Sequence, residues 1–165
     1  MSRSAIATCC AELARKNWKI SFVESASAGR LSYEFSLDAN SGKVLLGGSV
    51  CYDARLKQDL LGIPKALIEK YTAESAEVTA AMAESFQRLS KADVCVGLTG
   101  LTSPGGSESA EKPVGTIFTH ILMPGKSIAD RTVFEGSPEI IVSKTVEHVA
   151  QLLIRHLSAK AEITN

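Results

Sequence analysis

The stretch Trp18-Lys19-Ile20-Ser21-Phe22-Val23-Glu24-Ser25-Ala26-Ser27-Ala28-Gly29 contains the pattern that decides the fold. Its first six residues largely alternate between apolar and polar side chains, as a β-strand does. The small residues that follow stand where a strand ends, and the chain then continues through Phe35 with helical character. A strand, a turn of small residues and a helix in this order are typical of α/β domains. In such folds, binding and catalytic sites gather at the carboxyl ends of the strands.

Strands and helices alternate along the rest of the chain as well. We expect further strands at residues 45–52, 92–98, 114–123 and 128–134, the last two as a hairpin. Helical spacing of apolar residues predicts helices whose buried faces carry Ile6, Cys9, Cys10 and Leu13, then Val78, Ala81, Met82, Phe86 and Leu89, and finally Val142, Val146, Val149 and Leu153. Two short helices are expected on either side of Gly62-Ile63-Pro64. The pattern predicts a single three-layer α/β/α domain over residues 1–165, with a partly mixed sheet.

Composition excludes several classes of protein. Lys and Arg total 18 and Asp and Glu total 18, and this neutral balance disfavours a nucleic-acid partner, which a basic surface would recognise. The four cysteines show no metal-ligand spacing, so we expect free thiols, no metal and a reducing compartment. No apolar run approaches the ~18 residues of a membrane span, so we expect a cytoplasmic protein without membrane contact.

Two residues are candidates for nucleophilic chemistry. Ser25 and Ser27 stand at the expected start of a helix, where backbone N–H groups can stabilise an oxyanion or a phosphate, or where a serine simply caps the helix. His120, His148 and His156 do not fall where a Ser-His-Asp triad would need them. A buried lysine whose pKa falls to roughly 7–8 is an alternative base, and Lys57 is the candidate. The other interpretation of Lys57 is a solvated helix lysine.

A glycine-rich loop follows the strand at residues 92–98. The segment Thr99-Gly100-Leu101-Thr102-Ser103-Pro104-Gly105-Gly106 has the glycine density of a backbone nest that binds anions. A flexible surface loop is the competing interpretation, and the loop sequence alone does not decide between them. The segment Glu111-Lys112-Pro113-Val114-Gly115-Thr116 then leads into the next strand.

Three segments together resemble the CinA C-terminal domain family, whose active members are nicotinamide-nucleotide amidases. Glu24-Ser25-Ala26-Ser27-Ala28-Gly29 resembles the E-S-C-T-G-G segment of the family. Gly48-Ser49-Val50-Cys51-Tyr52, followed by Lys57 and Leu61-Gly62-Ile63, is similar to G-x-V-x-Y-S-N-x-x-K-x3-L-G-V. The segments from Thr99 to Thr116 resemble T-G-I-A-G-P-x-G-G and E-K-P-V-G-T. The similarity covers residues 5–157 in order.

The resemblance implies hydrolysis of the carboxamide of nicotinamide mononucleotide, or of a related compound, to the acid and ammonia, without a cofactor. It implies that Ser25 is the nucleophile and Lys57 its base, with Tyr52 nearby to relay a proton or orient the lysine. It also implies a pyridine nucleotide-like small molecule as partner and a homo-oligomeric assembly. Substrate contacts are expected, on the same basis, from Glu24, Ser27, Gly29, Gly48, Thr99, Gly100, Pro104, Gly105, Gly106 and Lys112.

The chain departs from the family pattern at several positions. Ala26, Ser27 and Ala28 replace C-T-G, Asp53-Ala54 replaces S-N, Thr102-Ser103 replaces A-G, and Pro104 meets Gly105 directly. Ser137-Pro138 stands where many members have D-R, and Val142 where another arginine is common. These changes keep the proposed nucleophile set and remove cations that could bind a phosphate. The alternative hypothesis is therefore a catalytically silent paralogue that binds a nucleotide or a protein partner.

Overall fold

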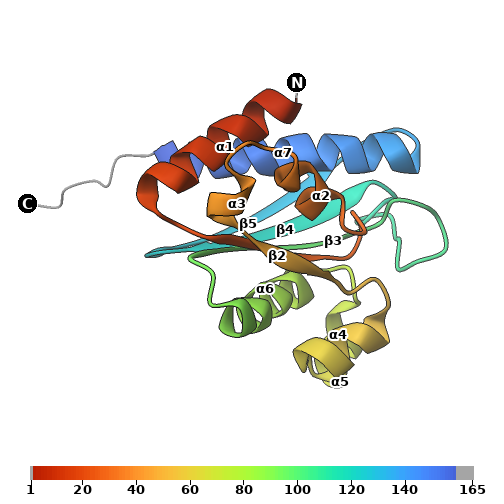
Figure 1. Ribbon diagram of the computed structural model, residues 1–165. Helices are drawn as coiled ribbons and strands as arrows, with labels where there is room; N and C mark the ends of the chain where they lie inside the picture. The colour runs from red at the N-terminus through yellow and green to blue at the C-terminus, as the bar shows by residue number, and fades with distance from the viewer. Residues whose placement is uncertain (1, 159–165) are drawn as a thin grey trace, which may run out of the picture.

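A computed structural model describes residues 2–158, which form a five-stranded sheet with helices on both faces (Figure 1). The strands follow the order β2-β1-β3-β4-β5. β1 pairs in parallel with β2 and β3, whereas β3 with β4 and β4 with β5 are antiparallel. This topology confirms the expected α/β/α class with a partly mixed sheet. The strands are β1 (Ile20–Glu24), β2 (Leu45–Val50), β3 (Val94–Gly100), β4 (Thr116–Met123) and β5 (Lys126–Val133).

The helices divide into two layers. One face of the sheet carries α1 (Ser2–Lys16), α2 (Arg30–Ser36), α3 (Ser41–Val44) and α7 (Pro138–Ser158), with α1 packed along α7 (Figure 1). The other face carries α4 (Ala54–Leu61), α5 (Lys65–Tyr71) and α6 (Ala76–Ser90). None of the helices in the described part of the chain combines the length and the apolar character that a membrane span requires.

Burial marks β1 as an inner strand of the sheet, between β2 and β3. All five of its residues are buried, because helices cover both of its faces. The larger apolar core lies between the sheet and the layer of α1 and α7, and it includes Phe22, which packs against Phe35 with ring centroids 4.8 Å apart. A smaller core lies beneath α4, α5 and α6 and includes Val23, Leu61 and Met82.

Two details of the expected helices are wrong. Leu89 was expected on the buried face of α6 but is 61% exposed, because it lies one residue before the end of the helix and beyond its last buried position, Ser85. Val142 was expected in the core but is only half-buried, because Ile141 and Thr145 occupy the inward positions of that part of α7. Val142 instead faces a cavity described below.

The carboxyl ends of the three parallel strands meet at one edge of the sheet. The Ser25 amide donates to the Leu98 carbonyl of β3 at 3.0 Å, and the Cys51 amide donates to the Glu24 carbonyl of β1 at 2.8 Å. These two hydrogen bonds bring together the turn after β1, the end of β2 and the loop after β3. The expectation that the glycine-rich turns lie at this edge is confirmed.

Candidate active site

A serine and a lysine from separate segments meet at this edge. Lys57 Nζ lies 3.1 Å from Ser25 Oγ. Lys57 has no exposed surface, and Ser25 is 5% exposed. The structure therefore excludes the interpretation of Lys57 as a solvated helix lysine and pairs it with the predicted nucleophile.

The lysine is held by two backbone carbonyls at the end of β2. Lys57 Nζ donates to the Cys51 carbonyl at 2.8 Å and to the Tyr52 carbonyl at 3.1 Å. The short turn that presents these carbonyls leads directly into α4, where the Asp53 side chain caps the helix by accepting from the Arg55 amide at 2.7 Å. Helix α4 then turns Lys57 back toward the strand that precedes it. Tyr52 thus orients the lysine through its backbone, while its side chain is 62% exposed.

Burial changes the acidity of the lysine. Removal from water lowers the pKa of Lys57 below its ordinary value of 10.5, because a low-dielectric surrounding disfavours the ammonium form. The Glu74 carboxylate acts in the opposite direction and raises this pKa. Burial is the larger effect, so the amine loses its proton more readily than a lysine in water.

Ser25 opens onto a cavity of about 210 Å³. Gly100, Pro104, Gly105 and Gly106, four of the residues expected to contact substrate, line this cavity. The loop is partly ordered by its own contacts, since the Gly105 amide donates to Glu108 Oε1 at 2.7 Å. The full lining consists of Ser25, Ala26, Tyr52, Glu74, Gly100, Leu101, Thr102, Ser103, Pro104, Gly105 and Gly106, and we call it the Ser25 pocket.

Glu24 lies beneath the turn rather than in the Ser25 pocket. It is fully buried, and Oε2 accepts from Ser27 Oγ at 2.6 Å and from the Gly29 and Leu31 amides at 3.0 Å. Oε1 accepts from the Ser32 amide at 2.8 Å and from Ser32 Oγ at 2.7 Å. Five donors saturate this carboxylate, so it holds the turn and the start of α2 in place and has no lone pair left for a ligand.

Thr99 and Gly48, also expected to contact substrate, lie outside the lining of the Ser25 pocket as well. Thr99 has no exposed surface, and its hydroxyl pairs with that of Thr79 at 2.8 Å. Gly48 lies where β2 passes α2, and a Cβ there would meet Ser32 Oγ and would come within 2.8 Å of the Phe22 carbonyl oxygen. The absence of a side chain at Gly48 is explained by packing rather than by a ligand.

Lys112 lies outside the lining of the Ser25 pocket and supports the glycine-rich loop that follows β3. Its Nζ donates to Thr72 Oγ1 at 2.6 Å, to Ser107 Oγ at 2.7 Å and to the Glu74 carbonyl at 2.9 Å. Burial lowers the pKa of Lys112 below its ordinary value. With its three hydrogen bonds committed to the protein, Lys112 connects the loop to the segment before α6.

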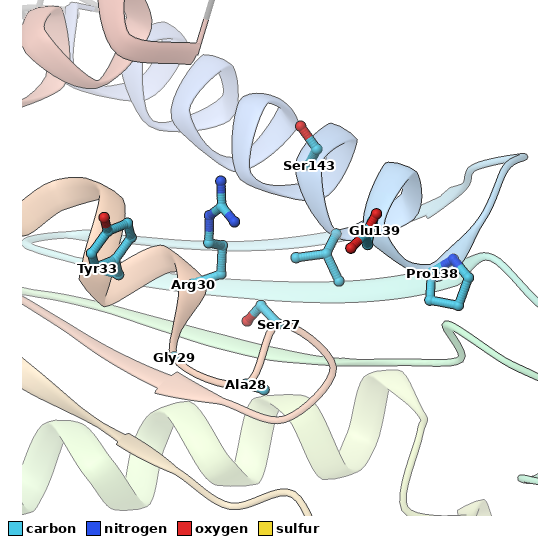
Figure 2. A pocket seen from close by; sticks show the side chains of 9 residues that line it. Ser27, Ala28, Gly29, Arg30, Tyr33, Pro138, Glu139 and Ser143 are labelled. Atoms are coloured by element: carbon cyan, nitrogen blue, oxygen red, sulfur yellow. The ribbon is translucent and has the colours of Figure 1, made fainter.

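Ser27 and Gly29 face a second cavity, on the α7 side of the turn (Figure 2). This cavity has a volume of about 640 Å³. Figure 2 shows Arg30 and Tyr33 of α2 on one side, and Pro138 and Glu139 at the start of α7 on the other. We call it the α2–α7 cavity; it is lined by Ser27, Ala28, Gly29, Arg30, Tyr33, Pro138, Glu139, Val142 and Ser143.

Sequence reasoning missed Glu74, which lines the Ser25 pocket. It lies just before Ser75, the residue that caps α6 by accepting from the Val78 amide at 3.2 Å. A carboxylate at this position resembles any solvated residue before a helix, and no motif in the chain marks it. Only the fold reveals that this segment borders the pocket. Within residues 2–158, no cluster of His, Cys, Asp and Glu is arranged to hold a metal ion.

The sequence comparisons agree with this architecture. A profile of the CinA C-terminal domain matches residues 3–157. The chain belongs to the CinA C-terminal domain family. A CinA-like protein of Leptospira biflexa is 36% identical over 151 residues, and one of Desulfotalea psychrophila is 32% identical over 145 residues. These alignments cover 90% and 88% of the chain but only 36% and 35% of the relatives, so the chain spans about a third of their length.

Solved CinA-type structures share the fold. A competence damage-inducible protein A of Klebsiella pneumoniae matches with a TM-score of 0.90 at 22% identity, over 95% of this chain and 97% of that one. A competence/damage inducible protein of Agrobacterium tumefaciens matches with a TM-score of 0.89 at 25% identity, over 96% of each chain. The family and the fold predicted from the sequence are thereby confirmed.

Proposed function

We propose that this CinA-family chain is an amidohydrolase of the nicotinamide-nucleotide amidase type, in which Ser25 attacks a carboxamide and Lys57 is the general base. The observation that carries the proposal is the environment of Lys57 Nζ. When the Lys57 amine is neutral, its two hydrogens are donated to the backbone carbonyls of Cys51 and Tyr52. The lone pair of that amine then faces Ser25 Oγ, 3.1 Å away.

The first chemical step is proton transfer coupled to attack. Neutral Lys57 takes the Ser25 hydroxyl proton as Oγ forms a bond to the carboxamide carbon, and the carbonyl oxygen becomes an oxyanion. The Ala26 amide is suited to stabilise this oxyanion, because it follows the nucleophile and has no acceptor in the part of the chain that the structure describes.

The second step releases ammonia. The Lys57 ammonium returns its proton to the leaving nitrogen, the carbon–nitrogen bond breaks, and an acyl ester remains on Ser25. Water then attacks the ester carbon while Lys57 takes a proton from it, and the acid departs as Ser25 recovers its hydrogen. The lowered pKa of Lys57 favours the neutral amine that accepts a proton in each of these steps.

Ammonia release from purified protein tests the proposal. We expect turnover of nicotinamide mononucleotide or a related pyridine carboxamide, and a loss of about 10³-fold or more in Ser25→Ala, because the covalent route disappears. Ser127→Ala is the matched serine control, since Ser127 is exposed on β5 and lies outside the lining of the pocket. Unchanged turnover in Ser25→Ala contradicts the assigned nucleophile. Absence of turnover across a panel of pyridine carboxamides supports the binding paralogue instead.

A further inference from the structure

The Ser25 pocket carries a negative charge. Glu74 is the one residue of its lining that bears a charge at neutral pH, within the residues that the structure describes. A cavity of about 210 Å³ is smaller than the roughly 300–1,000 Å³ of sites for drug-sized ligands, so it accommodates the amide end of a substrate rather than a whole nucleotide. The group that carries the carboxamide therefore lies near this carboxylate.

Glu74 is held in place by the loop on the other side of the pocket. Ser107 Oγ donates to Glu74 Oε2 at 2.5 Å, and Lys112 Nζ holds both Ser107 Oγ and the Glu74 carbonyl. No hydrogen-bond donor contacts Oε1 in the described residues, so this oxygen is free to face a ligand. Lys112 reaches the backbone of Glu74 rather than its carboxylate, so the carboxylate has no direct ionic partner there.

The cations around the two cavities, Lys57, Lys112 and Arg30, are each hydrogen-bonded to groups of the protein. Lys57 is committed to Ser25 and to two carbonyls, as described above. In the α2–α7 cavity, Arg30 is paired with Glu34 at 2.7 Å, and Glu139 lies on the opposite wall (Figure 2). The remaining residues of that wall, Pro138, Val142 and Ser143, are uncharged.

We infer that Glu74 is a specificity-determining residue that selects amides with a positive charge beside the carboxamide, such as N-substituted pyridinium carboxamides, and that a phosphate adds nothing to their binding. This inference rests on the proposed function, because it takes the Ser25 pocket as the amide site. The free carboxylate oxygen attracts a cationic ring and repels an anionic group brought into the same cavity. Recognition thus depends on the ring charge rather than on the anionic part of a nucleotide.

Binding measured by calorimetry tests this inference separately from catalysis. Ser25→Ala protein is titrated with nicotinamide, with 1-methylnicotinamide and with nicotinamide mononucleotide, so that turnover does not interfere. We expect the cationic 1-methylnicotinamide to bind about fivefold more tightly than neutral nicotinamide, the scale of a partly exposed charge pair. In Ser25→Ala/Glu74→Gln, the ratio of the affinity for 1-methylnicotinamide to the affinity for nicotinamide should fall to near one. The glutamine oxygen still accepts from Ser107, so the loop keeps its support.

Glu77→Gln in the same background is the matched control, because Glu77 is exposed in the first turn of α6 and outside the pocket lining. Its ratio should equal that of the parent protein. The inference is overturned by a ratio that Glu74→Gln leaves unchanged, by failure of 1-methylnicotinamide to bind, or by nicotinamide mononucleotide binding tenfold more tightly than 1-methylnicotinamide. If wild-type protein releases no ammonia but the ratio still depends on Glu74, the proposed function fails while the inference about charge selection stands.

Discussion

Lys57 is a buried amine whose hydrogen-bond partners in the described residues are all uncharged. Its neighbours are a hydroxyl and two carbonyls, whereas the Glu74 carboxylate acts only at longer range. Such surroundings destabilise the ammonium form of a lysine, and this lowers the pKa of the amine. Perturbed groups of this kind, when they face a cavity beside a nucleophile, are typical of catalytic sites.

The lowered pKa of Lys57 predicts how activity depends on pH. Because the neutral amine is the base, kcat/KM should rise with pH and reach a plateau below pH 10.5, the ordinary pKa of lysine. Initial rates of ammonia release across a pH series measure this profile. A flat profile would argue against Lys57 as the base.

The same shift predicts a change in stability that requires no substrate. Below pH 10.5 the unfolded chain holds a proton on this lysine that the folded protein binds more weakly, so the free energy of unfolding should rise with pH up to that value. Urea unfolding at several pH values should show this rise in wild-type protein and a smaller one in Lys57→Met. Equal slopes in the two proteins would contradict the assignment.

Ala28 is strained in the turn after Ser25. Its φ of 49° lies in the left-handed region, where an L-residue other than glycine is disfavoured by about 1–2 kcal/mol. Ala28→Gly should therefore raise the free energy of unfolding by up to about 1 kcal/mol, after the extra flexibility of glycine in the unfolded chain is subtracted. Ala80→Gly, within α6, should lower it by about 1 kcal/mol. Thermal unfolding of both variants measures the contrast, and a loss of stability in Ala28→Gly would refute the strain.

At the scale of elements, α6 approaches the sheet closely at Gly97. A Cβ on Gly97 would lie 2.8 Å from the Thr79 carbonyl oxygen and 3.0 Å from Ala83 Cβ, both on α6. Gly97→Ala should reduce the free energy of unfolding by about 1–3 kcal/mol, because helix and strand must separate. Gly42→Ala is the control, since a Cβ there meets no atom within 4 Å and alanine favours the helix. Chemical denaturation measures the free energy of unfolding of both variants. Equal values would show that the close approach of α6 to Gly97 does not determine the stability.

The sequence predicted the elements well because their periodicity is local. The alternation at Trp18–Val23 and the small residues after it place β1 and its turn, and both lie where expected. The pairing of Ser25 with Lys57 is implied by the family resemblance, and the fold places Lys57 Nζ 3.1 Å from Ser25 Oγ. The place of Glu74 in the pocket and the roles of Glu24 and Thr99 could not be predicted from the sequence, because they depend on which segments fold back against the turn. Leu89 shows the same limit, since periodicity does not reveal where a helix leaves the core.

At the scale of the whole molecule, assembly stays a prediction. Leu46 and Val50 are 49% and 41% exposed on β2, which lies at the edge of the sheet. Exposed apolar edge strands favour pairing with another chain. Light scattering during gel filtration should give a mass of at least twice 17.5 kDa, and Val50→Lys should lower it toward 17.5 kDa. A single mass of 17.5 kDa for wild-type protein would contradict the expected homo-oligomer.

The central claim is that Lys57 makes Ser25 nucleophilic, and covalent labelling tests it without knowledge of the substrate. Intact-mass spectrometry after incubation with a small fluorophosphonate measures the extent and rate of labelling. We predict one adduct on wild-type protein, none on Ser25→Ala, and labelling slowed by about 10²-fold or more in Lys57→Met, because the base is absent. Peptide mapping should place the adduct on Ser25. An unlabelled wild-type protein, or a Ser25→Ala variant labelled as readily as wild type, would contradict the account.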